Sequence, residues 1–155
     1  MGADTLIQLW IWLNAAYGVH PNLKIHTGGR MTFGYGMVHW KSINQKLDTK
    51  IFTEAEVVNV NNYLSYSIWI CLFMGEQEYD IKQNILFQDN RIKMKMGVNG
   101  KRSCTGNSRP INIRYFFAKD RVEINNVSIA YFSTEHMIAN LFTKALQGAL
   151  FETFC

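Results

Sequence analysis

The chain has 155 residues, 48% of them hydrophobic and 14% aromatic, which suffices for one sizeable core, so we expect a single domain over residues 1–155 and exclude a wholly disordered chain. The net charge of +4 suits a polyanionic partner such as nucleic acid without requiring one. Three cysteines without a CxxC spacing argue against a disulfide framework or a zinc site and fit a reducing compartment.

The first elements predicted along the chain are three strands. Leu6–Leu13 is rich in large apolar residues, which predicts a buried strand, and the absence of a basic residue before it argues against an export signal. The glycines of HTGGR, residues 26–30, predict a turn, and residues 31–36 and 37–43 predict two strands with a tight turn near Gly36. The opening third therefore predicts a three-stranded antiparallel meander.

The rest of the chain is predicted to alternate helices and short strands. Thr53 and Glu56 have the spacing of a capping box, and apolar residues follow at intervals of three and four, so we expect a helix from Thr53 to about Met74. The elements expected after it are a strand at 84–87, a short basic helix at 91–96, a mobile loop at 97–110, a helix at 111–122, a strand at 127–132, and an amphipathic helix at 133–147 capped by Ser133 or Thr134. The longest later apolar run, residues 67–75, is too short to span a bilayer.

Three strands, a helix, a fourth strand, helical segments, a fifth strand and a closing helix is the element order of the ribonuclease H fold. Five phrases resemble, in order and over nearly the whole chain, the RNase H domain that closes the polyprotein of copia-type LTR retrotransposons. They are AYGVHPNLKIHTGG (16–29), QKLDTKIFTEAEVV (45–58), ILFQDN (85–90), INIRYFFAKDRV (111–122) and STEHMIANLFTKALQGALF (133–151). The resemblance implies an α/β, ribonuclease H-like fold with a five-stranded mixed sheet, its first three strands antiparallel, flanked by helices.

The resemblance also implies cleavage of the RNA strand of an RNA–DNA hybrid with two divalent ions, Mg²⁺ or Mn²⁺. Such ions need hard oxygen ligands to stabilise the attacking and leaving oxygens, and the family supplies four carboxylates. The matching positions are Asn14 at the end of the first strand, Glu56 in the first helix, Asp89 after the fourth strand and Asn140 in the last helix. Glu56 and Asp89 are therefore the expected metal ligands, whereas the other two acids are amides.

The two amides predict an impaired site. A neutral amide oxygen cannot bridge two ions as a carboxylate does, and Asn14 stands at the bridging position. We therefore expect Mg²⁺ or Mn²⁺ to bind weakly if at all, and cleavage to be lost or impaired. Asn112 and Pro110 also differ from the family's wording, which indicates a degenerate copy.

The resemblance implies an RNA–DNA hybrid or another nucleic acid as partner, a reverse transcriptase domain of the parent polyprotein as a further candidate, no membrane, and a cytoplasmic (virus-like particle) or nuclear location. A basic set could contact phosphates, although a solvated basic face explains it equally well: Lys93, Lys95, Lys101, Arg102, Arg109 and Arg114. Two alternatives stay open. The chain could be a non-catalytic nucleic-acid-binding or interaction domain, or a functionless remnant of the element.

Overall fold

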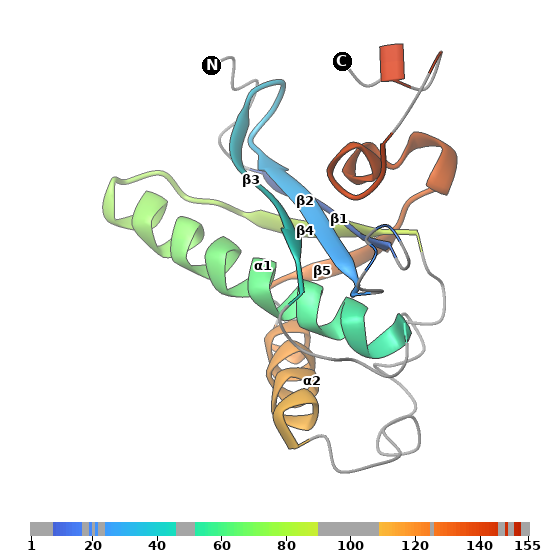
Figure 1. Ribbon diagram of the computed structural model, residues 1–155. Coiled ribbons are helices and arrows are strands. Elements are labelled where there is room, and N and C mark those ends of the chain that lie inside the picture. The colour runs from blue at the N-terminus through green and yellow to red at the C-terminus, as the bar shows by residue number, and fades with distance from the viewer. Residues whose placement is uncertain are drawn as a thin grey trace.

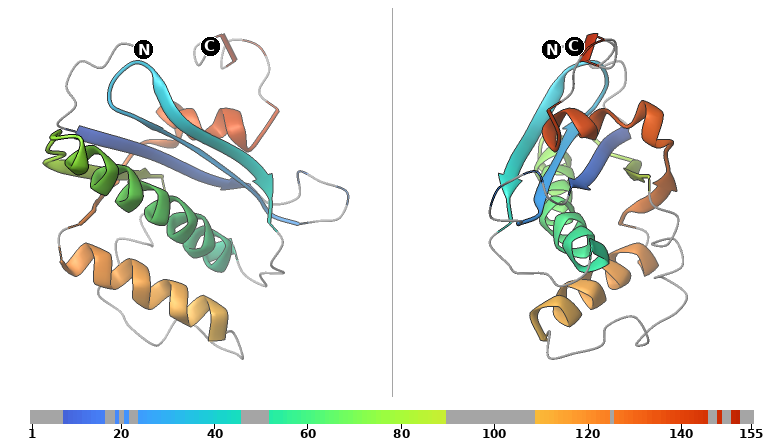
Figure 2. Two further views of the ribbon diagram at one scale, coloured as in Figure 1. Left: turned by 90° about the vertical axis from the view of Figure 1, so that its left-hand side faces the viewer. Right: turned by 45° about the vertical axis from the view of Figure 1, so that its right-hand side comes forward.

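The computed structural model describes residues 8–16, 19, 21, 24–45, 52–89, 109–124, 126–145, 148 and 151–152, and the side chains of 52–56, 109–112 and 115 lie outside that description. The elements are β1 (Gln8–Ala16), β2 (His26–Thr32), β3 (Met37–Asn44), α1 (Phe52–Glu76), β4 (Gln83–Gln88), α2 (Arg109–Glu123), β5 (Ser128–Tyr131) and two 3₁₀ helices, η2 (Thr134–His136) and η3 (Ile138–Phe142). Helices α1 and α2 lie on one face of a twisted sheet, and the 3₁₀ helices lie on the other (Figure 1, Figure 2).

The sheet has five strands in the order β3-β2-β1-β4-β5. Strand β1 is antiparallel to β2, and β2 to β3, whereas β1 is parallel to β4 and β4 to β5. The predicted mixed sheet with three antiparallel strands first is therefore confirmed. The last parallel pair joins Trp12 to Phe87, so Asn14 and Asp89, each two residues further on, reach the same edge of the sheet.

Strand β1 is buried on both faces. Leu9, Ile11 and Leu13 are fully buried in a core shared with residues of α1. On the other face, Trp12 packs with Met137 and Ala139 from the C-terminal segment. Side chains of a strand alternate between its faces, and this double burial explains why the sequence from Leu6 onward is almost continuously apolar.

The prediction of a turn at residues 26–30 and that of a strand at 31–36 are both wrong in position, because residues 26–32 form β2 and the turn lies at 33–36. The two glycines allow neighbouring segments to pack closely against β2 and do not form a turn. A Cβ at Gly28 would lie 2.6 Å from Phe142 Cβ, and one at Gly29 would lie 2.6 Å from Leu13 Cδ2 and even closer to the Trp12 carbonyl oxygen. The packing of η3 and β1 against β2 therefore requires glycine at positions 28 and 29.

The predicted α-helix at 133–147 is also wrong, since η2 and η3 replace it. Met137 separates them with an extended backbone (φ −71°, ψ 95°) and buries its side chain completely beside Trp12. Neither Ser133 nor any other side chain caps η2. The chain leaves the helical conformation here because an extended residue brings Met137 into the apolar cluster.

The other predicted elements agree with the structure in type and approximate bounds. They are the helix from Thr53, found as α1, the strand at 84–87, found as β4, the helix at 111–122, found as α2, and the strand at 127–132, found as β5. The predicted basic helix at 91–96 and the loop up to residue 108 lie outside the described residues, and residues 109–110 begin α2. Among the helices that the structure describes, none has the length and apolar character needed to cross a membrane.

The substitution Gly29→Ala tests the close approach of β1 and β2. We expect it to lower the free energy of unfolding by about 1–3 kcal/mol, because the added methyl group overlaps packed atoms. Gly75→Ala is the control, since a Cβ there meets nothing within 4 Å, and alanine in a helix should raise stability by about 0.5–1 kcal/mol. Urea unfolding measures both, and equal effects of the two variants would contradict the packing argument.

Candidate active site

Asn14 and Asn140 are in direct contact at the edge of the sheet. Asn14 Nδ2 donates a hydrogen bond to Asn140 Oδ1 at 2.7 Å and another to Thr143 Oγ1 at 2.7 Å. The exposed fractions of Asn14 and Asn140 are 6% and 8%. The fold therefore brings together, in a buried position, the two amides that stand where the resemblance expects acids.

The orientation of these amides follows from their other partners. Asn140 Nδ2 donates to the carbonyl oxygen of Thr134 at 3.0 Å, and a carbonyl oxygen only accepts. Asn140 must therefore turn its oxygen toward Asn14, which in turn must present its NH₂ group. Thr143 Oγ1 donates to the Asn140 carbonyl oxygen at 3.3 Å, so both hydrogens of Asn14 Nδ2 reach acceptors in one connected network.

Asp89 lies next to this network, immediately after β4. Thr134 Oγ1 donates to Asp89 Oδ2 at 3.2 Å, and Thr134 thereby links Asp89 to Asn140. The structure places Glu56 in the second turn of α1, but its side chain lies outside the described part of the chain. The structure thus connects Asn14, Asp89 and Asn140, and their assignment as site residues stays a prediction.

Two further polar residues, Asn59 and Ser42, hold the site in place, and sequence reasoning missed them. Asn59 Nδ2 from α1 donates to the Asn14 carbonyl oxygen at 2.8 Å. Ser42 Oγ from β3 donates to the Phe142 carbonyl oxygen at 2.7 Å, over the strand that contains Gly28. No spacing pattern in the sequence marks Asn59, Ser42 or Thr143. The signal that could have indicated a segment packed closely on β2 is the glycine pair Gly28 and Gly29, because glycine within a strand often marks close approach of another backbone.

An aromatic cluster borders the site on the same face of the sheet. The Trp12 ring stacks on Phe87 at 5.2 Å between centroids, and Phe87 meets Phe132 at 5.3 Å. The Arg30 guanidinium lies 4.7 Å from the Trp12 ring centroid, and burial lowers the pKa of Arg30 from its ordinary value. The cluster ties β1, β4 and the segment after β5 together beside the amide pair.

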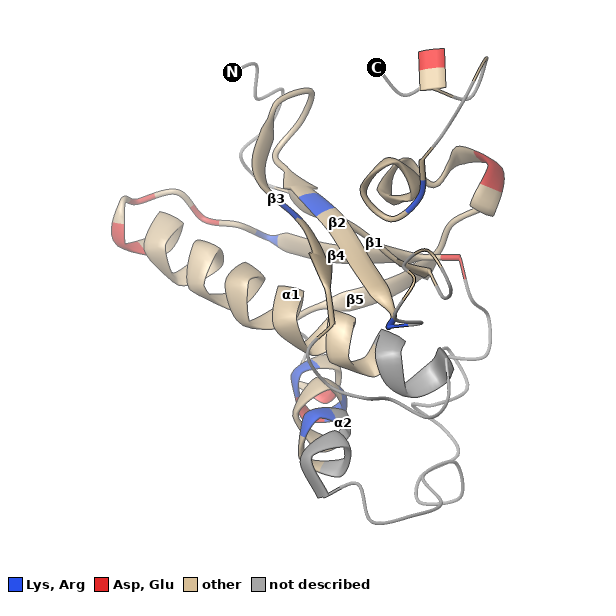
Figure 3. Ribbon diagram, in the orientation of Figure 1, with Lys and Arg blue, Asp and Glu red and all other residues tan. Residues whose placement is uncertain are grey.

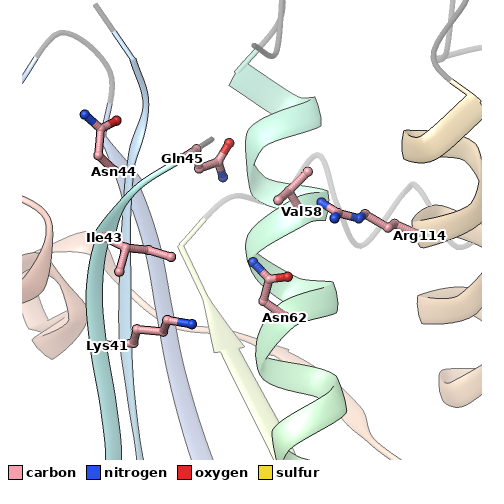
Figure 4. Close-up of a pocket in the computed structure, with 7 residues that line it drawn as sticks. All are labelled: Lys41, Ile43, Asn44, Gln45, Val58, Asn62 and Arg114. Carbon is pink, nitrogen blue, oxygen red and sulfur yellow. The ribbon is translucent and has the colours of Figure 1, made fainter. Parts of the chain in front are cut away.

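A cavity of about 590 Å³ lies on the opposite face, between β3, α1 and α2. Its lining residues are Lys41, Ile43, Asn44, Gln45, Val58, Asn62 and Arg114 (Figure 4). Lys41 Nζ lies 5.5 Å from the Tyr66 ring centroid, and one terminal nitrogen of Arg114 is buried without a hydrogen-bond partner. Among the described side chains neither cation forms a salt bridge with an acid.

Basic and acidic residues are both spread over the described part of the molecule. Lys and Arg lie on β2, β3 and α2, and acidic residues lie near the end of α1 and also on α2, where Glu123 and Asp120 pair with Lys119 and Arg121 (Figure 3). Of the basic set singled out in the sequence, the side chain of Arg114 is described and lines the cavity, and the others lie outside the described side chains. Lys41 and Arg114 are the two basic residues among those that line the cavity.

Two curated proteins with similar sequences are retrotransposon Pol polyproteins. The Pol polyprotein from transposon TNT 1-94 of Nicotiana tabacum is 25% identical over 151 residues, 97% of this chain and 11% of that protein. The Pol polyprotein from transposon RE2 of Arabidopsis thaliana is 25% identical over 150 residues, 96% of this chain and 10% of that protein. The chain thus spans about a tenth of the length of the curated relatives it matches, and no protein-family model matches it.

The solved structures that resemble the chain are RNase H domains. RNase H1 from Halobacterium salinarum superposes with a TM-score of 0.59 and 13% identity, covering 88% of this chain and 94% of that one. LC11-RNase H1 in complex with an RNA/DNA hybrid superposes with a TM-score of 0.52 and 13% identity, covering 87% and 93%. The chain therefore has an RNase H-like fold. Its sequence is similar to part of retrotransposon Pol polyproteins.

Asn14 and Asn140 do not fit the ligand positions of a two-metal centre. Asn14 presents an amide nitrogen, which has no free lone pair for a metal, and Asn140 presents an oxygen without the negative charge of a carboxylate. Within the described residues, no group of three or more His, Cys, Asp or Glu is placed to hold an ion. Asp89 keeps its carboxylate, which accepts a hydrogen bond from Thr134, and the side chain of Glu56 lies outside the description. The expectation of weak metal binding therefore stays a prediction.

The substitution Gly28→Ala tests whether η3 is seated directly on β2. A Cβ at this position would lie 2.6 Å from Phe142 Cβ and 2.7 Å from its carbonyl oxygen. We expect amide hydrogen exchange in residues 138–145 to become at least about tenfold faster, which corresponds to about 1.4 kcal/mol of lost local stability. Gly75→Ala serves as the control, and unchanged exchange in Gly28→Ala would contradict the placement of η3.

Proposed function

We propose that this chain is an RNase H-like domain of a copia-type retrotransposon polyprotein that has lost most or all cleavage of RNA in RNA–DNA hybrids and keeps weak hybrid binding. Similarity to Pol polyproteins along 97% of the chain supports the lineage. The observation that carries the proposal is the buried hydrogen bond between Asn14 and Asn140. It occupies the edge of the sheet where the resemblance calls for carboxylates.

The loss of charge is large enough to account for a loss of activity. A unit charge ~4 Å from a divalent ion at an effective dielectric of ~20 contributes roughly 8 kcal/mol before desolvation is subtracted. A residual loss of only ~3 kcal/mol weakens ion binding about a hundredfold. Because two charges are missing and one of them belongs to the expected bridging position, we propose that cleavage suffers more than hybrid binding does.

Hybrid binding depends on other features of the molecule. Lys41 and Arg114 bring positive charge to the cavity between β3, α1 and α2, and the chain as a whole has a net charge of +4. An RNase H1 of similar fold has been solved in complex with an RNA/DNA hybrid. These observations support a nucleic acid as partner, since neutralisation of phosphates by Lys and Arg supplies most of the non-specific affinity.

The cleavage assay compares the natural chain with the double substitution Asn14→Asp, Asn140→Asp on a labelled RNA–DNA hybrid in Mg²⁺ and in Mn²⁺. We expect no cutting, or at least about a hundredfold slower cutting, by the natural chain. The double variant should be the more active protein because it has all four acids. Robust cleavage by the natural chain would overturn the loss of activity.

The binding assay uses the double substitution Lys41→Ala, Arg114→Ala. We expect weaker hybrid binding and a salt dependence that is shallower by about one to two phosphate contacts, because each neutralised phosphate releases a counterion. The matched control is the double substitution Lys82→Ala, Lys119→Ala, which also removes two positive charges, at residues that do not line the cavity. Equal affinity of both variants for the hybrid would show that the cavity does not contribute to hybrid binding.

A second candidate function, a non-catalytic protein-interaction domain, is favoured by an exposed apolar surface on α1. Residues 57–75 contain no charged side chain, and Trp69 and Leu72 are 61% and 67% exposed. Exposed apolar surface of this kind is characteristic of interaction sites. The hybrid-binding assay discriminates the two candidates, because an interaction domain of this type has no reason to bind the hybrid.

A further inference from the structure

We infer that Asn14, Asn140 and Thr143 form a metal-independent clamp that holds η3 against β1. The clamp occupies the place where the resemblance expects carboxylates with an ion between them. This inference goes beyond the proposed function, because it concerns what stabilises the site and not what the site cleaves. It rests on four hydrogen bonds between or within the two segments: Asn14 to Asn140, Asn14 to Thr143, Asn140 to Thr134, and Thr143 to Asn140.

The clamp works because each donor in it faces an acceptor. Thr134 supplies an acceptor to Asn140, Asn140 supplies an acceptor to Asn14, and the second hydrogen of Asn14 reaches Thr143. Buried polar groups are costly unless they are paired in this way. Asn14 and Asn140 are both buried, and because their side chains are neutral, the contact needs no ion to balance charge.

The two amides depend on each other. An acid at position 14 would place an acceptor oxygen against the acceptor oxygen of Asn140. The Asn140 amide cannot rotate to avoid this without losing its hydrogen bond to the Thr134 carbonyl oxygen. An acid at position 140 could still accept from Asn14, but its other oxygen would face the Thr134 carbonyl. Acids at both positions would place two negative charges in a buried contact, and a cation would then be required to hold the segments together.

The segment from η2 to η3 also contacts the sheet outside the clamp. Met137 and Ala139 are fully buried beside Trp12, and Ser42 donates to the Phe142 carbonyl oxygen. Loss of the clamp should therefore weaken the attachment of η2 and η3 and leave the sheet folded, because these contacts remain. Local exchange and the melting midpoint are both informative readouts for this reason.

The experiment measures melting midpoints of the natural chain, Asn14→Asp, Asn140→Asp and the double variant, each in excess EDTA and in excess MgCl₂. The natural chain should melt at the same temperature in both. Each single variant should melt lower by about 3–8 °C. The double variant should melt lower in EDTA and recover in MgCl₂, with amide exchange in residues 134–145 following the same pattern. Asn126→Asp, on an exposed residue, is the control for the added charge.

Two results would overturn the clamp: a midpoint of the natural chain that rises in MgCl₂ as much as that of the double variant, or single variants as stable as the natural chain. If the double variant fails to fold, Thr143→Val removes one acceptor of Asn14 and should speed exchange of residues 138–145 severalfold. The outcome is independent of the cleavage assay. An active natural chain with a midpoint insensitive to MgCl₂ would overturn the proposed loss of activity and leave the clamp standing.

Discussion

Strand β1 must be covered on both of its faces, and the rest of the structure depends on this constraint. Leu9, Ile11 and Leu13 point toward α1, while Trp12 points toward the C-terminal segment. Burial of such large side chains stabilises each contact by roughly 1.5–3 kcal/mol per residue. The helix on one side and the 3₁₀ helices on the other are therefore positioned by the same nine-residue strand.

A polar residue near the end of this doubly buried strand must find partners within the protein. Asn14 finds them in Asn140 and Thr143, and its own carbonyl oxygen accepts from Asn59 of α1. The site is thus joined to both layers that cover the sheet. A carboxylate in this place would need cations or donors to offset its burial, whereas the amide supplies the donors itself.

Most of the fold could be predicted from local pattern and from the resemblance. Apolar periodicity and turn residues predict three opening strands, α1, β4, α2 and β5, although β2 lies at 26–32 and not at 31–36. Local pattern cannot place Gly28 and Gly29, because glycine signals both turns and close approach. The neighbours that decide between the two, Trp12 and Phe142, are remote in sequence. The break at Met137 was missed because its cause is the apolar pocket beside Trp12 and not a local helix-breaking residue.

The sequence by itself determined the order of the elements, the lineage through its five phrases, and the two positions at which amides replace the expected acids. Only the tertiary structure decided that these amides bond to each other, which way each one faces, and that Thr134, Thr143 and Asn59 complete the network. The physical reason is that a hydrogen bond depends on distance and direction between atoms. Those are set by packing between segments more than a hundred residues apart, and no local pattern encodes them.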